Sequence, residues 1–94
     1  MEENELYLKF EKLENNYIEI EKEFKTIFKL YKNDFENLVK MAIVFYDLSL
    51  NYLKENKRLS NLYNNYFEKI NEHIIIKYSR EDLNYYFNKV GLEE

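Results

Sequence analysis

The chain carries one histidine, His73, and histidine is the side chain best suited to acid–base chemistry at neutral pH. On a helix, His73 would lie beside Lys69 and Lys77, which are four residues away on either side. A general base needs a carboxylate that orients its ring, whereas the adjacent Glu72 would point to another side of the helix. We therefore expect a histidine at the surface or boundary, and His73→Ala should leave stability and activity unchanged.

Two pairs of glutamates have the spacing at which carboxylates share one helix face: Glu19 with Glu23, and Glu68 with Glu72. Carboxylate metal sites in helical bundles combine such residues with Glu-x-x-His motifs, and the sequence contains no such motif. The pairs are therefore predicted to lie on solvated faces. No metal site and no cofactor is expected, and the absence of cysteine excludes thiolate chemistry and disulfides.

Besides the tyrosines, four residues carry a hydroxyl group: Thr26, Ser49, Ser60 and Ser79. None of the serines stands in a G-x-S-x-G or S-x-x-K pattern, in which the neighbouring residues activate the hydroxyl. The single glycine, Gly91, cannot form a glycine-rich loop that holds a phosphate. The sequence therefore predicts no catalytic residues and a protein that is not an enzyme.

The composition favours one helical domain over residues 1–94. Of the 94 residues 46% are apolar, which suffices for a core, and one glycine with no proline is too few for the tight turns of sheets. The net charge of -4 and the small number of arginines disfavour sequence-specific binding to nucleic acid. The most apolar run, residues 41–53, is shorter than the roughly 20 residues of a membrane span. A cytoplasmic location fits a chain without cysteine.

Apolar side chains recur every three or four residues along the first third of the chain, and we call this set of side chains the N-terminal stripe. Its members are Leu6, Phe10, Leu13, Tyr17, Ile20, Phe24, Ile27 and Tyr31. This 3.5-residue period predicts a long, coiled-coil-like helix over about residues 4–32. Further helices are expected at about 35–55, 59–77 and 80–90, giving an all-α, antiparallel three- to four-helix bundle. Because the period continues beyond residue 33, one unbroken helix past Tyr52 stays an alternative.

The length of the first helix predicts self-association. A helix from Leu6 to Tyr31 is about 39 Å long, which exceeds the diameter of about 32 Å of a compact chain of this size. Its first part would overhang the bundle and expose the stripe at Leu6, Phe10, Leu13 and Tyr17. Because an exposed apolar stripe promotes association, we expect a homodimer or another homo-oligomer.

A second candidate surface lies in the expected helix 80–90. Its apolar face contains Leu83, Tyr86, Phe87 and Val90. Tyr85 is turned by about 100° from this face, and Tyr78 and Arg80 lie near the start of the helix. Tyrosine and arginine often anchor interfaces, so Tyr78, Arg80 and Tyr85 are predicted to bind a partner protein. The alternative is that both tyrosines pack over neighbouring helices.

These observations favour a small cytoplasmic protein–protein interaction module, an adaptor or assembly protein that acts by helix packing. One alternative is an inhibitor encoded by a phage or mobile element, of the anti-CRISPR or anti-restriction type, that binds a nucleic-acid-handling enzyme or defence complex. The small size, the acidity and the abundance of residues with AT-rich codons agree with this alternative. A helical bundle like the bacteriocin-immunity proteins is a more distant alternative.

Overall fold

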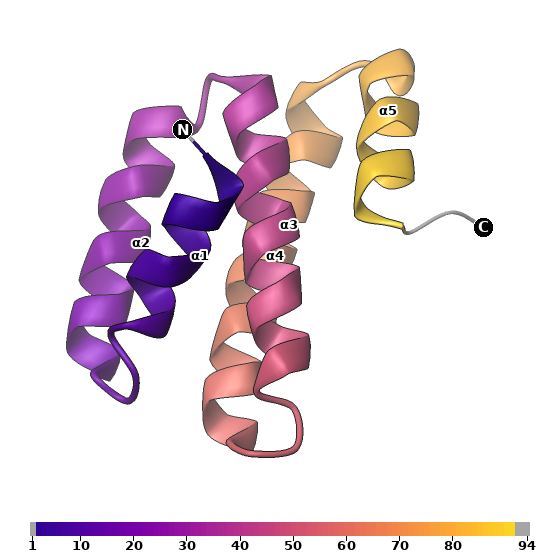
Figure 1. Cartoon of the computed structure of the whole chain (residues 1–94). Helices are drawn as coiled ribbons and strands as arrows, with labels where there is room; N and C mark the ends of the chain where they lie inside the picture. Colours follow the sequence, from indigo (N-terminus) through magenta and orange to yellow (C-terminus); the bar gives the residue numbers. More distant parts are fainter. Residues whose placement is uncertain (1, 92–94) are drawn as a thin grey trace.

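The computed structural model describes residues 2–91, and within them the chain forms five α-helices and no β-strand (Figure 1). The helices are α1 (Glu3–Glu11), α2 (Tyr17–Tyr31), α3 (Phe35–Asn51), α4 (Lys57–Lys77) and α5 (Arg80–Val90). They account for 81% of this part of the chain, which confirms the prediction of an all-α protein. None of the five is long and apolar enough to cross a membrane.

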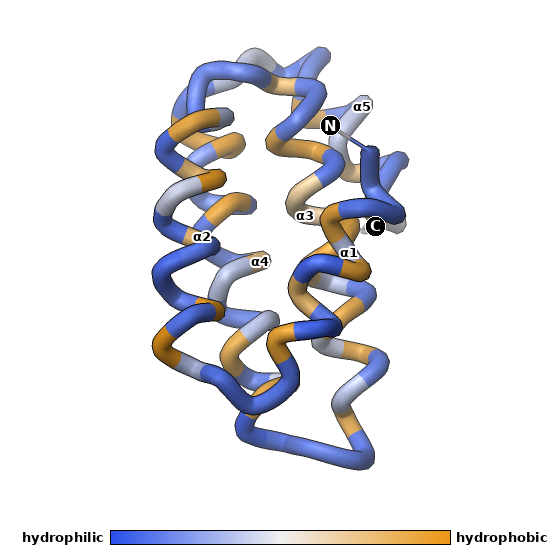
Figure 2. Tube along the Cα trace, turned by 60° about the vertical axis from the view of Figure 1, so that its left-hand side comes forward, coloured by the Kyte–Doolittle hydropathy of each residue, from blue (hydrophilic) through white to orange (hydrophobic). Residues whose placement is uncertain are grey.

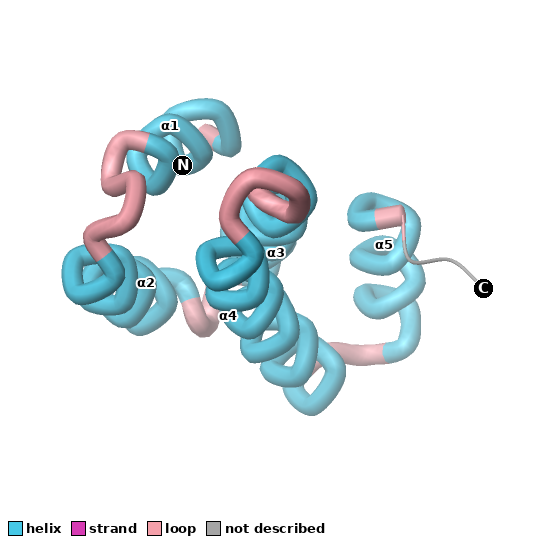
Figure 3. Tube along the Cα trace, turned by 90° about the horizontal axis from the view of Figure 1, so that it is seen from below, coloured by secondary structure: helices cyan, strands magenta, loops and turns pink. Residues whose placement is uncertain are grey.

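The helices α3 and α4 run antiparallel to each other in the middle of the molecule (Figures 1 and 3). Each begins at a side-chain cap: Asp34 Oδ1 accepts a hydrogen bond from the Asn37 amide at 3.3 Å, and Asn56 caps α4 in the same way. The Ser60 hydroxyl donates to the Ser49 carbonyl at 2.6 Å and ties the two helices together. The structure places α3 in contact with all the other helices, as its apolar circumference predicts.

The predicted continuous helix over residues 4–32 is wrong. It is interrupted between Glu11 and Tyr17, where residues 12–16 form a turn and Glu14 takes a φ of 46°. Asn16 then caps α2 by accepting a hydrogen bond from the Glu19 amide at 3.2 Å. Folding back at this turn brings both halves of the N-terminal stripe onto one core, which explains why the structure has five helices in residues 2–91.

The turn also removes the expected overhang. The radius of gyration is 12.8 Å, close to the value of about 12 Å for a compact chain of this length, so the predicted overhang is absent. Leu6 is 5% exposed and Phe10 is fully buried, and the expectation that they lie on an open surface is therefore wrong as well. Their burial needs no second chain.

Aromatic rings from four helices meet at the centre of the core. Phe45 of α3 lies 4.9 Å from Phe10 of α1 and 5.4 Å from Phe24 of α2, measured between ring centroids. Phe24 stacks on Tyr66 of α4 at 4.0 Å. Hydrophobic and hydrophilic segments alternate along the helices (Figure 2), as expected where each helix buries one face.

The last helix, α5, has the predicted bounds, and a cap is present at each of its ends. The Ser79 hydroxyl accepts a hydrogen bond from the Asp82 amide at 3.4 Å, and Gly91 ends the helix in the left-handed conformation. The helix packs on α3, on the side away from α1 and α2 (Figures 1 and 3), and buries Tyr86 and Val90. The helices expected at about 35–55 and 59–77 correspond to α3 and α4. The loop between them lies at residues 52–56, so α3 ends before residue 55 and α4 begins before residue 59.

Candidate functional site

The three residues predicted to bind a partner lie near one end of the molecule but in different environments. Tyr78 is half-buried, with its ring 4.8 Å from that of Phe35 and its hydroxyl buried without a hydrogen-bond partner. Arg80 is exposed at the first position of α5. Tyr85 is 49% exposed, and its ring lies 6.0 Å from that of Phe35. The prediction of two exposed tyrosines is therefore wrong for Tyr78, which packs against α3.

Tyr85 lies at a small groove of about 260 Å³, here called the Tyr85 groove. The groove is lined by Glu3, Glu36, Val39, Lys40, Ile43, Tyr85 and Lys89. The ammonium of Lys89 lies 5.4 Å from the centroid of the Tyr85 ring, a distance that suits a cation–π contact. Lys89 follows Tyr85 by four residues, so helical spacing could have found it, whereas Val39 and Ile43 come from a different helix.

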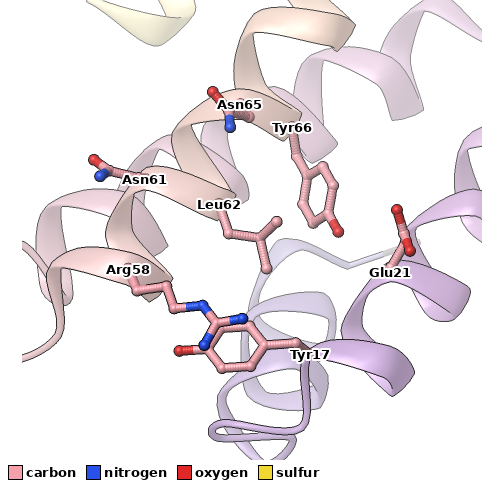
Figure 4. Close-up of a pocket in the computed structure, with 7 residues that line it drawn as sticks. All are labelled: Tyr17, Glu21, Arg58, Asn61, Leu62, Asn65 and Tyr66. Atoms are coloured by element: carbon pink, nitrogen blue, oxygen red, sulfur yellow. The ribbon is translucent and has the colours of Figure 1, made fainter.

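A second pocket, of about 270 Å³, opens between α2 and α4 (Figure 4). Its lining residues are Tyr17, Glu21, Arg58, Asn61, Leu62, Asn65 and Tyr66. The Arg58 guanidinium lies over the Tyr17 ring at 4.2 Å from its centroid. The pocket thus offers the hydrogen-bonding amides of two asparagines beside a stacked cation.

The phenol of Tyr66 is the most perturbed group of this pocket. Its hydroxyl is buried, has no hydrogen-bond partner and points towards Glu21 in Figure 4. Burial raises the pKa of Tyr66 to about 12, and the charge of Glu21 adds to this rise. The phenol therefore stays protonated near neutral pH, where it can donate a hydrogen bond but cannot act as a base. Neither a histidine nor a cysteine lines the pocket.

The remaining members of the predicted self-association surface do not form one exposed face. Leu13 and Tyr17 are half-buried at the turn between α1 and α2, and Tyr17 belongs to the pocket just described. Leu6 and Phe10 belong to the core.

His73 lies at the boundary between core and solvent, as predicted, but it holds a neighbouring helix. Its Nε2 donates to the carbonyl of Lys32, the C-cap of α2, at 2.7 Å, and its ring meets Phe28 edge to face at 5.3 Å. Lys77 also donates to this carbonyl and to the Asn33 side chain. This contact gives His73 a structural role that the sequence did not predict. Within residues 2–91, no three histidine or acidic side chains gather where they could hold a metal ion.

Comparisons of the chain with protein-family models, with curated proteins and with solved structures find no match. The fold and its surfaces define the class, which is a small all-α protein with an exposed aromatic groove at α5 and a polar pocket between α2 and α4.

Proposed function

We propose that this chain is a small cytoplasmic protein–protein interaction module, of the adaptor or assembly type, that binds its partner at the Tyr85 groove. The observation that carries the proposal is the state of Tyr85, whose ring is half exposed yet in contact with Phe35 and Lys89. A ring already held in place loses little conformational freedom when a partner covers it. Exposed tyrosines of this kind are frequent anchors of protein interfaces.

The groove also suggests what the partner presents. Val39 and Ile43 supply apolar lining, while Glu3, Glu36 and Lys89 place charges of both signs around it. A volume of about 260 Å³ lies below that of small-molecule sites, which begins at about 300 Å³. The groove suits one or two apolar side chains flanked by polar groups, as on an amphipathic helix of another protein.

The proposal is tested by comparing the proteins that wild-type and Tyr85→Ala baits capture from the native host, followed by affinity measurements with the partner identified. Removing an interface anchor should cost more than about 1 kcal/mol of binding free energy, while the melting temperature stays unchanged. The matched control is Asn84→Ala, which changes an exposed residue of the same helix outside the groove. Unchanged affinity in Tyr85→Ala would refute the assignment of this groove.

Tyr78→Ala separates binding from packing. Because Tyr78 packs on Phe35 and buries its hydroxyl, its loss should lower the free energy of unfolding, by about 1–3 kcal/mol, and leave the affinity per folded molecule intact. If Tyr85→Ala lowers stability in the same way, both tyrosines are packing residues and the proposal fails.

A further inference from the structure

The turn between α1 and α2 interrupts an apolar pattern that the sequence continues without a gap. The N-terminal stripe keeps its 3.5-residue period through the turn, with Leu13 and Tyr17 in phase on either side of Glu14. If residues 12–16 became helical, residues 3–31 would form one helix whose apolar residues all lie along one stripe. The sequence is therefore compatible with both a closed hairpin and an open helix.

The closed turn contains an unfavourable backbone conformation. Glu14 is the only residue other than glycine with a positive φ in residues 2–91, and a side chain with a Cβ atom disfavours this left-handed region. Backbone hydrogen bonds close the turn, among them the one from the Asn16 amide to the Leu13 carbonyl at 2.9 Å. Two exposed side-chain hydrogen bonds add to them: the Asn16 cap on Glu19, and a contact of 2.8 Å from Asn56 Nδ2 to Asn15 Oδ1. Glu14, the residue with the left-handed backbone conformation, thus lies in a segment where the N-terminal stripe keeps its helical spacing.

The turn between α2 and α3 provides a contrast. The apolar period also continues there, but Asp34 caps the new helix and no residue takes a positive φ. His73 and Lys77 both hydrogen-bond to the Lys32 carbonyl and fix this turn to α4. Of these two turns, the one at Glu14 alone combines an uninterrupted apolar period with a disfavoured backbone conformation.

We propose that two copies of this chain exchange α1. The turn at residues 12–16 becomes helical, α1 and α2 merge into one helix, and each α1 packs on α3 of the other copy. The partner is a second copy because the contacts that hold α1, such as Phe10 against Phe45 at 4.9 Å and the Tyr63 hydroxyl on the Phe10 carbonyl, re-form unchanged between chains. The turn contacts are lost, and its half-buried Leu13 and Tyr17 join the shared stripe of the open helix.

Two substitutions shift this equilibrium in opposite directions. Glycine accepts a positive φ, so Glu14→Gly stabilises the closed turn and should lower the dimer association constant at least about tenfold. Asn16→Ala removes the helix cap of the closed turn and thereby favours the open form. The dimer association constant should rise about tenfold, because the turn at residues 12–16 opens in both chains of the dimer. Sedimentation equilibrium after refolding at high protein concentration measures both. Lys22→Ala, an exposed change within α2, is the control and should leave the constant unchanged.

An engineered thiol cross-link reports the exchange directly, because the natural chain has no cysteine. The side chains of Tyr7 on α1 and Asn51 on α3 interact, so a short bismaleimide can bridge thiols at these two positions. Tyr7→Cys and Asn51→Cys chains are refolded together, separated by size and treated with the bismaleimide. A cross-link between the two different chains is expected in the dimer fraction. Lys25→Cys, exposed on α2, replaces Tyr7→Cys as the control and should give none.

Two results would overturn the proposal. The first is that the chain stays monomeric at millimolar concentration even when it carries the substitution Asn16→Ala. The second is a dimer whose association constant does not change with Glu14→Gly and that forms no specific cross-link between Tyr7→Cys and Asn51→Cys, which assigns association to another surface. Of the residues that line the Tyr85 groove, Glu3 belongs to α1 and changes chain on exchange, whereas those of α3 and α5 stay in one chain. Tyr85→Ala therefore still tests partner binding separately from these results.

Discussion

The centre of the core and the region around α5 are both built from tyrosine and phenylalanine, but they differ in how many helices hold each ring. Phe45 at the centre contacts rings of α1, α2 and α4. Tyr86 of α5 is equally buried, yet its helix packs mainly on α3. Two side chains that are equally buried therefore need not contribute equally to the stability of the fold. A ring held by four helices stabilises the whole fold, whereas a ring on the outer helix stabilises its attachment.

The polar ends of the rings differ as well. The Tyr63 hydroxyl at the centre donates to the Phe10 carbonyl at 3.4 Å, whereas the hydroxyls of Tyr66, beside the pocket between α2 and α4, and of Tyr86 are buried without a partner in the described chain. A buried hydroxyl without a partner loses its hydrogen bonds to water on folding and gains nothing in return. The packing of α5 on α3 therefore leaves one polar group of α5, the Tyr86 hydroxyl, buried without a hydrogen bond.

The largest expected effect lies at the centre. Phe45→Ala removes a fully buried ring that contacts three other helices, and it should lower the free energy of unfolding by about 3–5 kcal/mol. Urea unfolding followed by circular dichroism measures this. Ile18→Ala changes an apolar residue that is 82% exposed and should stay within about 0.5 kcal/mol of the wild type. Similar losses in both variants would contradict a core centred on Phe45.

Alkaline pH should destabilise both regions through their tyrosines. Burial raises the pKa of Tyr66 to about 12 and raises those of Tyr63 and Tyr86 further, from a usual value of 10.0. The phenols are neutral in both states below pH 10, so no stability is lost there. Above it the unfolded chain releases protons first, and each tyrosine costs about 1.4 kcal/mol per pH unit until the pKa of the folded state is reached. Tyr66→Phe should make the decline between pH 10 and 12 shallower, and an unchanged decline would contradict this.

Much of this fold follows from local sequence signals. The Ser79 cap and Gly91 define α5 at its predicted bounds, because both signals act within one helical turn. The break at residues 12–16 was missed because the period of the N-terminal stripe describes which face is apolar and not where the chain reverses. Asn16 is a good helix cap, but without the core that Leu6 and Phe10 enter, nothing in the sequence favours the reversal over a continuous helix.

The candidate site was predicted in part for a similar reason. Helical spacing placed Tyr85 outside the buried face, and the structure agrees. The same reasoning failed for Tyr78, because it precedes the helix and its contact with Phe35 joins residues more than forty positions apart. Tyrosine suits both core and surface, so only the tertiary contacts distinguish the two roles.

The same substitution should have opposite effects at Tyr63 and at Tyr86, which are both fully buried. Tyr63→Phe removes a hydroxyl that donates to Phe10 and should lower stability by about 1 kcal/mol. Tyr86→Phe removes a hydroxyl without a partner and should raise stability by a similar amount, about 1 kcal/mol. Chemical unfolding of both variants, with equal slopes against denaturant, checks the pair. If both lose stability, the Tyr86 hydroxyl has a partner and the contrast between the regions disappears.

The smallest expected effect concerns His73, which lies along α4 between the central Tyr66 and the connection to α5. Because its Nε2 donates to the Lys32 carbonyl, His73→Ala should lower stability by about 0.5–1 kcal/mol, contrary to the silence expected from sequence. Hydrogen exchange should show the loss mainly in the last turn of α2, with the amides of α5 unaffected. His73→Gln retains a side-chain donor and should recover part of the loss, while Glu72→Ala, an exposed neighbour, should change neither. Equal exchange in wild type and His73→Ala would mean that Lys77 alone holds the end of α2, since its ammonium reaches the same carbonyl.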